Sequence, residues 1–193
     1  MKKFVLLLLV AILAGCASSV VKIEGDHLVQ QRLNVKVSDA WNKFPSGGQP
    51  FELWTQEGLT LDQLRIWAGI KSGQSLVMAS TASSDQKAQR VPTYTAGMAP
   101  DQLVNLLEIM YSADGSLVSM DKVEPAPFAG EKGLRIEFSI TRKSDDVQLR
   151  GVGWMAVRNN ELFAASFVAP RLAFFPRLLP RAERVMQSAR IAG

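Results

Sequence analysis

Residues 133–169 restrict the fold of this chain more than any other segment. Apolar and polar side chains alternate there with a period of two, and the apolar members of the first run are Leu134, Ile136, Phe138 and Ile140. Turn-forming residues at 143–146, and an Asn159-Asn160 pair that tolerates the positive φ of a tight hairpin, divide the segment. We therefore expect three antiparallel strands in succession.

Shorter patterns place the other elements. Alternation at 32–37 predicts a strand, and residues 51–55 and 59–71 predict a hairpin. Pro100 suits the first turn of a helix, and a second helical face follows Pro180. This order predicts an α+β fold, in which an antiparallel sheet carries packed helices in an α/β/α sandwich-like arrangement.

Two segments are expected to break this regular structure. Ser38 and Asp39 are typical caps of a turn, which would then carry Trp41 and Phe44. The prolines of the sequence Glu124-Pro125-Ala126-Pro127 are expected to interrupt a strand. Both segments are therefore predicted to lie outside the strands.

The N-terminus has the pattern of an export signal. Lys2 and Lys3 precede an apolar run at 4–13, which is much shorter than the about 20 residues of a membrane-spanning helix. The sequence Leu13-Ala14-Gly15-Cys16 follows, and all four positions resemble the bacterial lipobox. We expect a signal peptide at 1–15, a lipidated cysteine with its tether at 16–31, and a single domain at 32–193.

The lipobox resemblance implies that the thiol of Cys16 receives diacylglycerol and that the leader is cleaved before it. Several acyl chains on one residue would hold the protein firmly on a membrane. Cys16 is the only cysteine of the 193 residues, so a lipidated chain has no thiol left for a disulfide. Ala17 in the next position favours the outer membrane, facing the periplasm, if the host is Gram-negative. The alternative is an ordinary secretory signal with an incidental cysteine.

Residues that perform catalysis or hold metal ions are scarce. His27 is the only histidine and falls within the expected tether, where we expect a solvated imidazole. Transition-metal sites recruit imidazole or thiolate ligands, so no metal site is expected. The adjacent Asp145 and Asp146 fall in a predicted turn, and Asp62 follows another, where Asp serves the backbone. No catalytic residue and no cofactor are predicted.

Two glycines lie within the second strand of the expected meander. Gly151-Val152-Gly153 lacks the following helix and the Lys-Ser/Thr pair of a phosphate-binding loop. We expect these glycines to make room for a bulky neighbour such as Phe138 or Trp154.

Two groups of side chains are candidates for contact with a ligand or a partner. Trp67 and Trp154 lie on the more polar side of their strands, so they either line an apolar surface or pack against a covering helix. Arg177, Arg181 and Arg184 recur about one turn apart on the last helix. These arginines either contact anionic groups such as lipid phosphates or form a solvated face.

The body of the chain also resembles a known group of folds. A sheet that ends with Asn159-Asn160-Glu161-Leu162-Phe163, closed by a helix that ends with Gln187-Ser188-Ala189-Arg190-Ile191, is similar to the Mog1/PsbP-like α/β/α sandwich over residues 90–193. That group includes nuclear-transport and photosystem-associated proteins and many bacterial lipoproteins, so the resemblance implies a binding or assembly role. Residues 54–62 are similar to small proteobacterial lipoproteins, which imply no activity.

We therefore expect a membrane-anchored periplasmic lipoprotein that acts without catalysis as a binding or assembly module of the cell envelope. Its partners would be the membrane, through the lipid, and an envelope protein. Two alternatives stay open, a carrier of a small apolar ligand and a carboxylate-dependent hydrolase. Loss of Lys2 and Lys3 leaves 20 basic and 18 acidic residues, and so small an excess gives no support to nucleic-acid binding.

Overall fold

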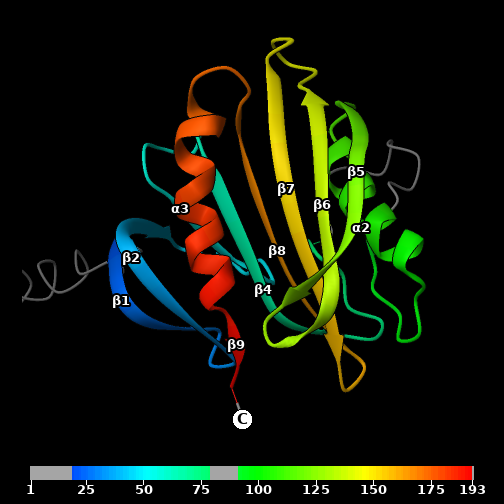
Figure 1. Cartoon of the computed structure of the whole chain (residues 1–193). Coiled ribbons are helices and arrows are strands. Elements are labelled where there is room, and N and C mark those ends of the chain that lie inside the picture. The colour runs from blue at the N-terminus through cyan, green and yellow to red at the C-terminus, as the bar shows by residue number, and fades with distance from the viewer. Residues whose placement is uncertain (1–18, 79–90, 193) are drawn as a thin grey trace, which may run out of the picture.

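The computed structural model describes residues 19–78 and 91–192, so Cys16 and the expected signal peptide lie outside the described residues. Within these ranges, nine strands form one sheet and two helices pack on it (Figure 1). The elements are β1 (Val21–Val29), β2 (Leu33–Phe44), β3 (Glu52–Thr55), β4 (Gln63–Lys71), α2 (Pro100–Ser112), β5 (Leu117–Phe128), β6 (Glu131–Thr141), β7 (Gln148–Arg158), β8 (Glu161–Pro170), α3 (Phe174–Ser188) and β9 (Arg190–Ile191).

The sheet is built from two antiparallel meanders that meet in its middle. Its strand order is β1-β2-β3-β4-β8-β7-β6-β5, and β9 pairs with β2. The join is the antiparallel pair β4–β8, which aligns Gln63 with Val168 and Arg65 with Ser166. The chain leaves β4, passes through α2 to the far edge at β5, and returns strand by strand to β8. The meander expected at 133–169 is confirmed as β6, β7 and β8.

Each face of the sheet carries its own core and its own helix. Figure 1 shows α3 in front of the strands and α2 behind them. Neighbouring residues of β8 alternate between the two cores, because Phe163 and Phe167 pack on the α3 side while Leu162 and Val168 pack on the α2 side. Both faces are therefore buried, and the expected α+β sandwich is confirmed.

The domain begins earlier than expected. The tether predicted at 16–31 is wrong from Val21 onward, because Val21–Val29 forms β1 and pairs with β2. Only Ile23 and Val29 of this edge strand are buried, so the strand has no period of two that a sequence could reveal. A register shift between Ile23 and Gly25 disturbs the period further.

The two expected breaks in regular structure and the expected start of the last helix are also wrong. Ser38 and Asp39 do not cap a turn but lie within β2, which carries the fully buried Trp41. Residues 124–127 do not interrupt β5, since this strand is at the edge of the sheet, where proline is tolerated. The last helix starts at Phe174 and keeps Pro180 inside it.

A bulge in β4 places Ile70 on the opposite face of the sheet from Leu64, Ile66 and Ala68. Gly69 has a φ of +93°, and the pairing with β8 shifts between Ala68 and Ile70. Leu64, Ile66 and Ala68 therefore pack on the α3 side, whereas Ile70 packs on the α2 side with Trp67.

Candidate functional site

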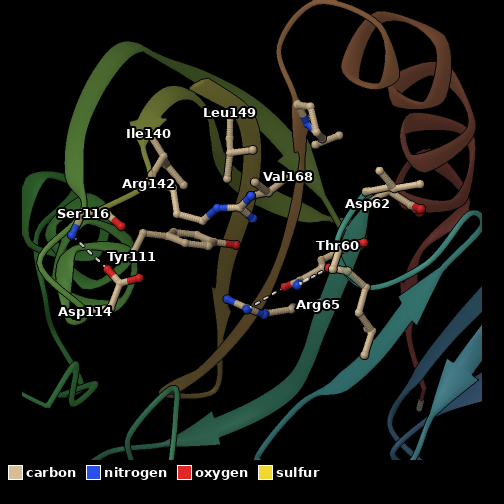
Figure 2. Close-up of a pocket in the computed structure, with 15 residues that line it drawn as sticks. Thr60, Asp62, Arg65, Tyr111, Asp114, Ser116, Ile140, Arg142, Leu149 and Val168 are labelled. Atoms are coloured by element: carbon tan, nitrogen blue, oxygen red, sulfur yellow. Dashed lines mark hydrogen bonds between the residues drawn. The ribbon is translucent and has the colours of Figure 1, made fainter. Parts of the chain in front are cut away.

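A pocket of about 210 Å³ opens on the α2 side of the sheet. It forms because α2 packs on β5 and β6 and ends at Ser112. On this face, the start of β4 and the end of β8, which pair with each other, are therefore left without a covering helix. The side chains that matter for its chemistry come from four strands, α2 and the β6–β7 turn (Figure 2). They are Arg65, Tyr111, Ile140, Arg142, Leu149 and Val168.

Arg65 supplies positive charge to the floor of this pocket. Its guanidinium carbon lies 5.5 Å from the ring centroid of Phe51 and 5.3 Å from that of Tyr111. Nη2 donates a 2.7 Å hydrogen bond to the side-chain oxygen of Gln63. Among residues 19–78 and 91–192, Arg65 makes no ion pair and its buried Nε has no acceptor.

Tyr111 joins α2 to the sheet at the edge of the pocket. Its hydroxyl and that of Ser166 on β8 share a hydrogen bond of 2.8 Å. Its ring lies 5.1 Å from that of Phe138, centroid to centroid. Contacts at both ends fix the ring that faces Arg65.

Arg142 is the second cation of the pocket, and its charge is already paired. Its Nε and Nη2 donate to the two carboxylate oxygens of Asp145 at 2.8 and 2.6 Å. This hydrogen bonding raises the pKa of Arg142 and lowers the pKa of Asp145. Asp145 and Asp146 lie between β6 and β7, so the predicted turn role is confirmed for Asp145, whose Oδ1 also accepts from the Val147 N–H at 3.3 Å.

Asp62 borders the pocket but turns its carboxylate away from Arg65 (Figure 2). Its side chain is 1% exposed and accepts from the Thr55 hydroxyl at 2.8 Å. It also accepts from the backbone N–H groups of Gln56 at 2.7 Å and Glu57 at 2.8 Å. Asp62 therefore organises the β3–β4 turn, as expected from the sequence.

The two tryptophans proposed as a ligand surface are core residues. Trp67 is fully buried on the α2 side, where its Nε1 donates to the Leu76 carbonyl at 2.8 Å. Trp154 is 6% exposed and packs on the α3 side. The structure does not bring them together, and the packing alternative is the correct one, because the sandwich covers both faces of the sheet.

The three arginines of α3 bind polar side chains of the same domain. Arg177 pairs with Glu57 in the β3–β4 turn, and Arg184 pairs with Asp39 of β2. Arg181 donates to the side-chain oxygen of Gln56 at 2.7 Å. The hydrogen bond from Arg177 lowers the pKa of Glu57. Of the two alternatives given for these arginines, anionic contact and a solvated face, the structure adds that Arg177 and Arg184 already have acidic partners from distant parts of the chain while their side chains stay 50% and 48% exposed.

His27 is also held inside the domain rather than solvated. Its Nε2 lies 3.0 Å from Oε2 of Glu52, and its ring packs edge-on against Trp54 at 5.2 Å between centroids. Trp54 Nε1 donates to the same carboxylate oxygen at 2.9 Å. The imidazole thus helps to fix β1 against β3, and its solvated assignment is wrong because β1 belongs to the sheet.

Residues 19–78 and 91–192 contain no cluster of three His, Cys, Asp or Glu side chains suited to a metal ion. Neither helix in those ranges is long and apolar enough to cross a membrane.

Comparison with known proteins identifies the fold. No family model and no curated protein matches the chain. The solution structure of cyanobacterial PsbP (CyanoP) from Synechocystis sp. PCC 6803 is similar at a TM-score of 0.54 and 12% identity, over 94% of this chain and 99% of that one. The fold is PsbP-like. The resemblance expected for residues 90–193 therefore extends over nearly the whole chain.

A second solved structure has a lower similarity. It is LpqN, involved in cell envelope biogenesis of Mycobacterium tuberculosis, at a TM-score of 0.42 and 11% identity. The alignment covers 93% of this chain and 88% of that one. At these identities the likeness concerns the fold and assigns no activity to the pocket.

The pocket itself was missed by reasoning from the sequence. Arg65 falls on the polar side of its strand, and Tyr111 lies at the end of an amphipathic helix, which are ordinary positions for both residue types. Nothing local indicates that they meet. One signal was available. Arg65 shares a strand face with Trp67, and in a sandwich both faces of the sheet are covered, so an arginine there indicates a buried polar site.

Proposed function

We propose that the protein is a lipoprotein of the cell envelope whose PsbP-like domain acts without catalysis as a binding or assembly module. Cys16 would carry the lipid, with the domain on the periplasmic face of the outer membrane and an envelope protein as its partner. The observation that carries the proposal is the sequence Leu13-Ala14-Gly15-Cys16, directly after the apolar run at 4–13. The PsbP-like fold supports a binding role, in line with the roles implied by the resemblance.

The position of β1 limits how far the domain could lie from a lipid on Cys16. Val21, the first residue of β1, is five residues beyond Cys16, and five residues span at most about 18 Å when fully extended. The end of the sheet that carries β1 would therefore stay close to the headgroups. A partner reached by this domain would lie on or near the same membrane.

The polar groups of the pocket support binding better than hydrolysis. Asp62 and Asp145 are two of the carboxylates considered for acid–base catalysis. Their carboxylate oxygens accept hydrogen bonds from other groups of their own turns. The apolar-carrier alternative has less support, because the residues that it assigned to the ligand serve the two cores of the sheet. Its two proposed anchors, Trp67 and Trp154, are packed in the cores.

Metabolic labelling tests the anchor. Cells producing the wild-type chain or Cys16→Ser would be grown with a labelled fatty acid, and the protein would be isolated from membrane and soluble fractions. We expect label and membrane partitioning for the wild type and loss of both for Cys16→Ser. Ser18→Ala, which leaves the lipobox intact, is the matched control. Equal labelling and partitioning of wild type and Cys16→Ser would overturn the proposal.

Crosslinking in intact cells tests the binding role. A photo-crosslinking residue in place of Leu172, which is 90% exposed before α3, would report on neighbours of the domain without disturbing its core. We expect a defined envelope protein to be crosslinked by the anchored chain and to be lost with Cys16→Ser. Recovery of only the most abundant lipoproteins, unchanged by Cys16→Ser, would contradict the assembly role.

A further inference from the structure

We propose that the pocket beside Arg65 binds a small organic acid through its carboxylate, with the apolar part of the ligand against β6, β7 and β8. The proposal names a ligand class for the binding module proposed above. It rests on that function only in assuming that the domain binds rather than transforms its ligand, and it does not depend on lipidation of Cys16.

The charge of Arg65 supplies the first part of the argument. A partly buried guanidinium without a counter-charge is costly, and arginines in such places are normally paired with carboxylates. Arg142 in the same pocket has Asp145, whereas Arg65 has only the neutral oxygen of Gln63 among residues 19–78 and 91–192. Its orphan Nε also leaves hydrogen-bonding capacity unused in that part of the chain. A bound anion would supply the missing counter-charge.

The rigidity of Arg65 selects a planar anion. The rings of Phe51 and Tyr111 lie against its guanidinium, and Gln63 holds one of its nitrogens. A guanidinium fixed in this way loses little further freedom when it binds a ligand. Its planar fork of N–H groups matches the two oxygens of a carboxylate. The nearby hydroxyl of Tyr111, already bonded to Ser166, borders the same space.

The side chains that line the pocket and the pocket volume indicate the character and size of the apolar part of the ligand. Ile140, Leu149 and Val168 present apolar side chains to the pocket, and Figure 2 shows them on the opposite side of the space from Arg65. The volume of about 210 Å³ exceeds that of the about 150 Å³ cavity that holds benzene. It is below the about 300 Å³ of the smallest drug-sized sites. A carboxylate on one ring or on a short aliphatic chain fits these limits.

A doubly charged phosphate fits the pocket less well. Such an anion is best held by several free cations or backbone N–H groups. Arg142 is occupied by Asp145, and the pocket also contains the carboxylate of Asp114, whose Oδ1 accepts from the Ser116 N–H at 2.9 Å. Among the described residues, Arg65 is the guanidinium of this pocket that has no acidic partner, and its planar fork matches a single carboxylate.

Titration calorimetry of the full chain in nanodiscs tests the inference, with sodium benzoate and sodium hexanoate as probes. We expect saturable binding of at least one probe and at least tenfold weaker binding to Arg65→Gln. Benzyl alcohol, which lacks the carboxylate, and inorganic phosphate are each expected to bind at least tenfold more weakly than that probe. Arg171→Gln, which removes an exposed arginine bonded to Gln148, should bind as the wild type does.

A second pair of probes distinguishes the source of the carboxylate. A short apolar peptide with a free C-terminus would be compared with the same peptide amidated at its C-terminus. Tighter binding of the free peptide than of benzoate and hexanoate would identify a chain terminus as the ligand. Tighter binding of the small acids would identify a free metabolite, and either result supports a carboxylate site.

Three results would overturn the inference. They are the absence of saturable binding for all carboxylate probes, equal affinities of wild type and Arg65→Gln, and phosphate binding tighter than any carboxylate. If Arg65→Gln fails to fold, Arg65→Lys keeps the charge and is expected to lose affinity because it lacks the planar fork. Fatty-acid labelling of Cys16 is independent of these titrations. If the protein is labelled but binds no carboxylate, the proposed ligand is wrong and the proposed lipid-anchored module is unaffected.

Discussion

Thr55 and Asp62 close the β3–β4 turn with a buried hydrogen bond of 2.8 Å from the threonine hydroxyl to Oδ1 of the carboxylate. The same hydroxyl accepts from the backbone N–H of Gly58 at 2.7 Å. With the two backbone donors that Asp62 also satisfies, the pair completes the hydrogen bonding of a turn that Arg177 of α3 then contacts through Glu57. Asp62 thus holds the turn between β3 and β4, and the carboxylate of Glu57 in this turn connects it to α3.

Asp62→Ala should destabilise the domain by about 3 kcal/mol, because it leaves a buried hydroxyl and two backbone N–H groups without their acceptor. Urea denaturation followed by circular dichroism would measure the loss. Asp145→Ala removes an exposed turn carboxylate and should therefore destabilise the domain much less than Asp62→Ala does. Equal losses for the two variants would contradict the role assigned to Asp62.

Gly151→Ala should destabilise the domain by about 1–3 kcal/mol through overpacking. A Cβ at this position would lie 2.2 Å from Cζ of Phe138, whose ring occupies the space above the glycine. The sequence-based expectation that this glycine admits a large neighbour is confirmed. The double variant Gly151→Ala/Phe138→Leu should lose less than the sum of the two single losses, measured by urea denaturation. Simple additivity would show that the two side chains do not compete for space.

Glu161→Gln should reduce the dependence of stability on pH in acid. The hydrogen bond from Arg32 lowers the pKa of Glu161, so in the native state this carboxylate stays ionised at a pH where the unfolded chain takes up a proton. The pair therefore contributes stability above the unfolded pKa of about 4.3, and that contribution is lost as the pH falls through the folded pKa.

Urea midpoints at pH 6 and pH 3 would measure this effect. The stability difference between wild type and Glu161→Gln should be largest at pH 6 and should shrink at pH 3. Glu108→Gln is the control, since Glu108 is exposed on α2 and makes no ion pair with any described residue. A wild-type advantage that grows as the pH falls would show that the sign is wrong.

Trp67→Phe should destabilise the domain by about 1–3 kcal/mol, since the Leu76 carbonyl loses its donor and the core loses volume. Thermal unfolding by calorimetry would measure it, with Trp154→Phe on the opposite face as the control for loss of indole volume. The loss of stability for Trp67→Phe should exceed the loss for Trp154→Phe.

The fluorescence of a variant that retains only Trp67 should not change with added lipid, because this indole is buried in the core. A blue shift of its emission would favour the apolar carrier instead.

The sequence by itself determined the elements in which apolar residues recur with a regular spacing or lie between clear turn residues. Alternation predicted β6, the turns at 143–146 and 159–160 predicted β7 and β8 between and after them, and helical spacing predicted α2. Turn chemistry placed Asp62 and Asp145 correctly, since Asp bonds to backbone groups a few residues away. The lipobox at Cys16 is a reading of the sequence alone and stays a prediction.

Only the tertiary structure decided which side chains meet. β1 lies at one edge of the sheet and buries few residues, so it had no readable period. β5 lies at the other edge, where proline is tolerated, so its continuation through residues 124–127 could not be read from the sequence. Arg177 and Arg184 of α3 pair with acidic residues of the β3–β4 turn and of β2. Arg65 contacts Tyr111 because β4 pairs with β8 near the end of α2. Periodicity reports which face a residue takes, whereas the neighbour on that face depends on a strand order that joins residues about a hundred positions apart.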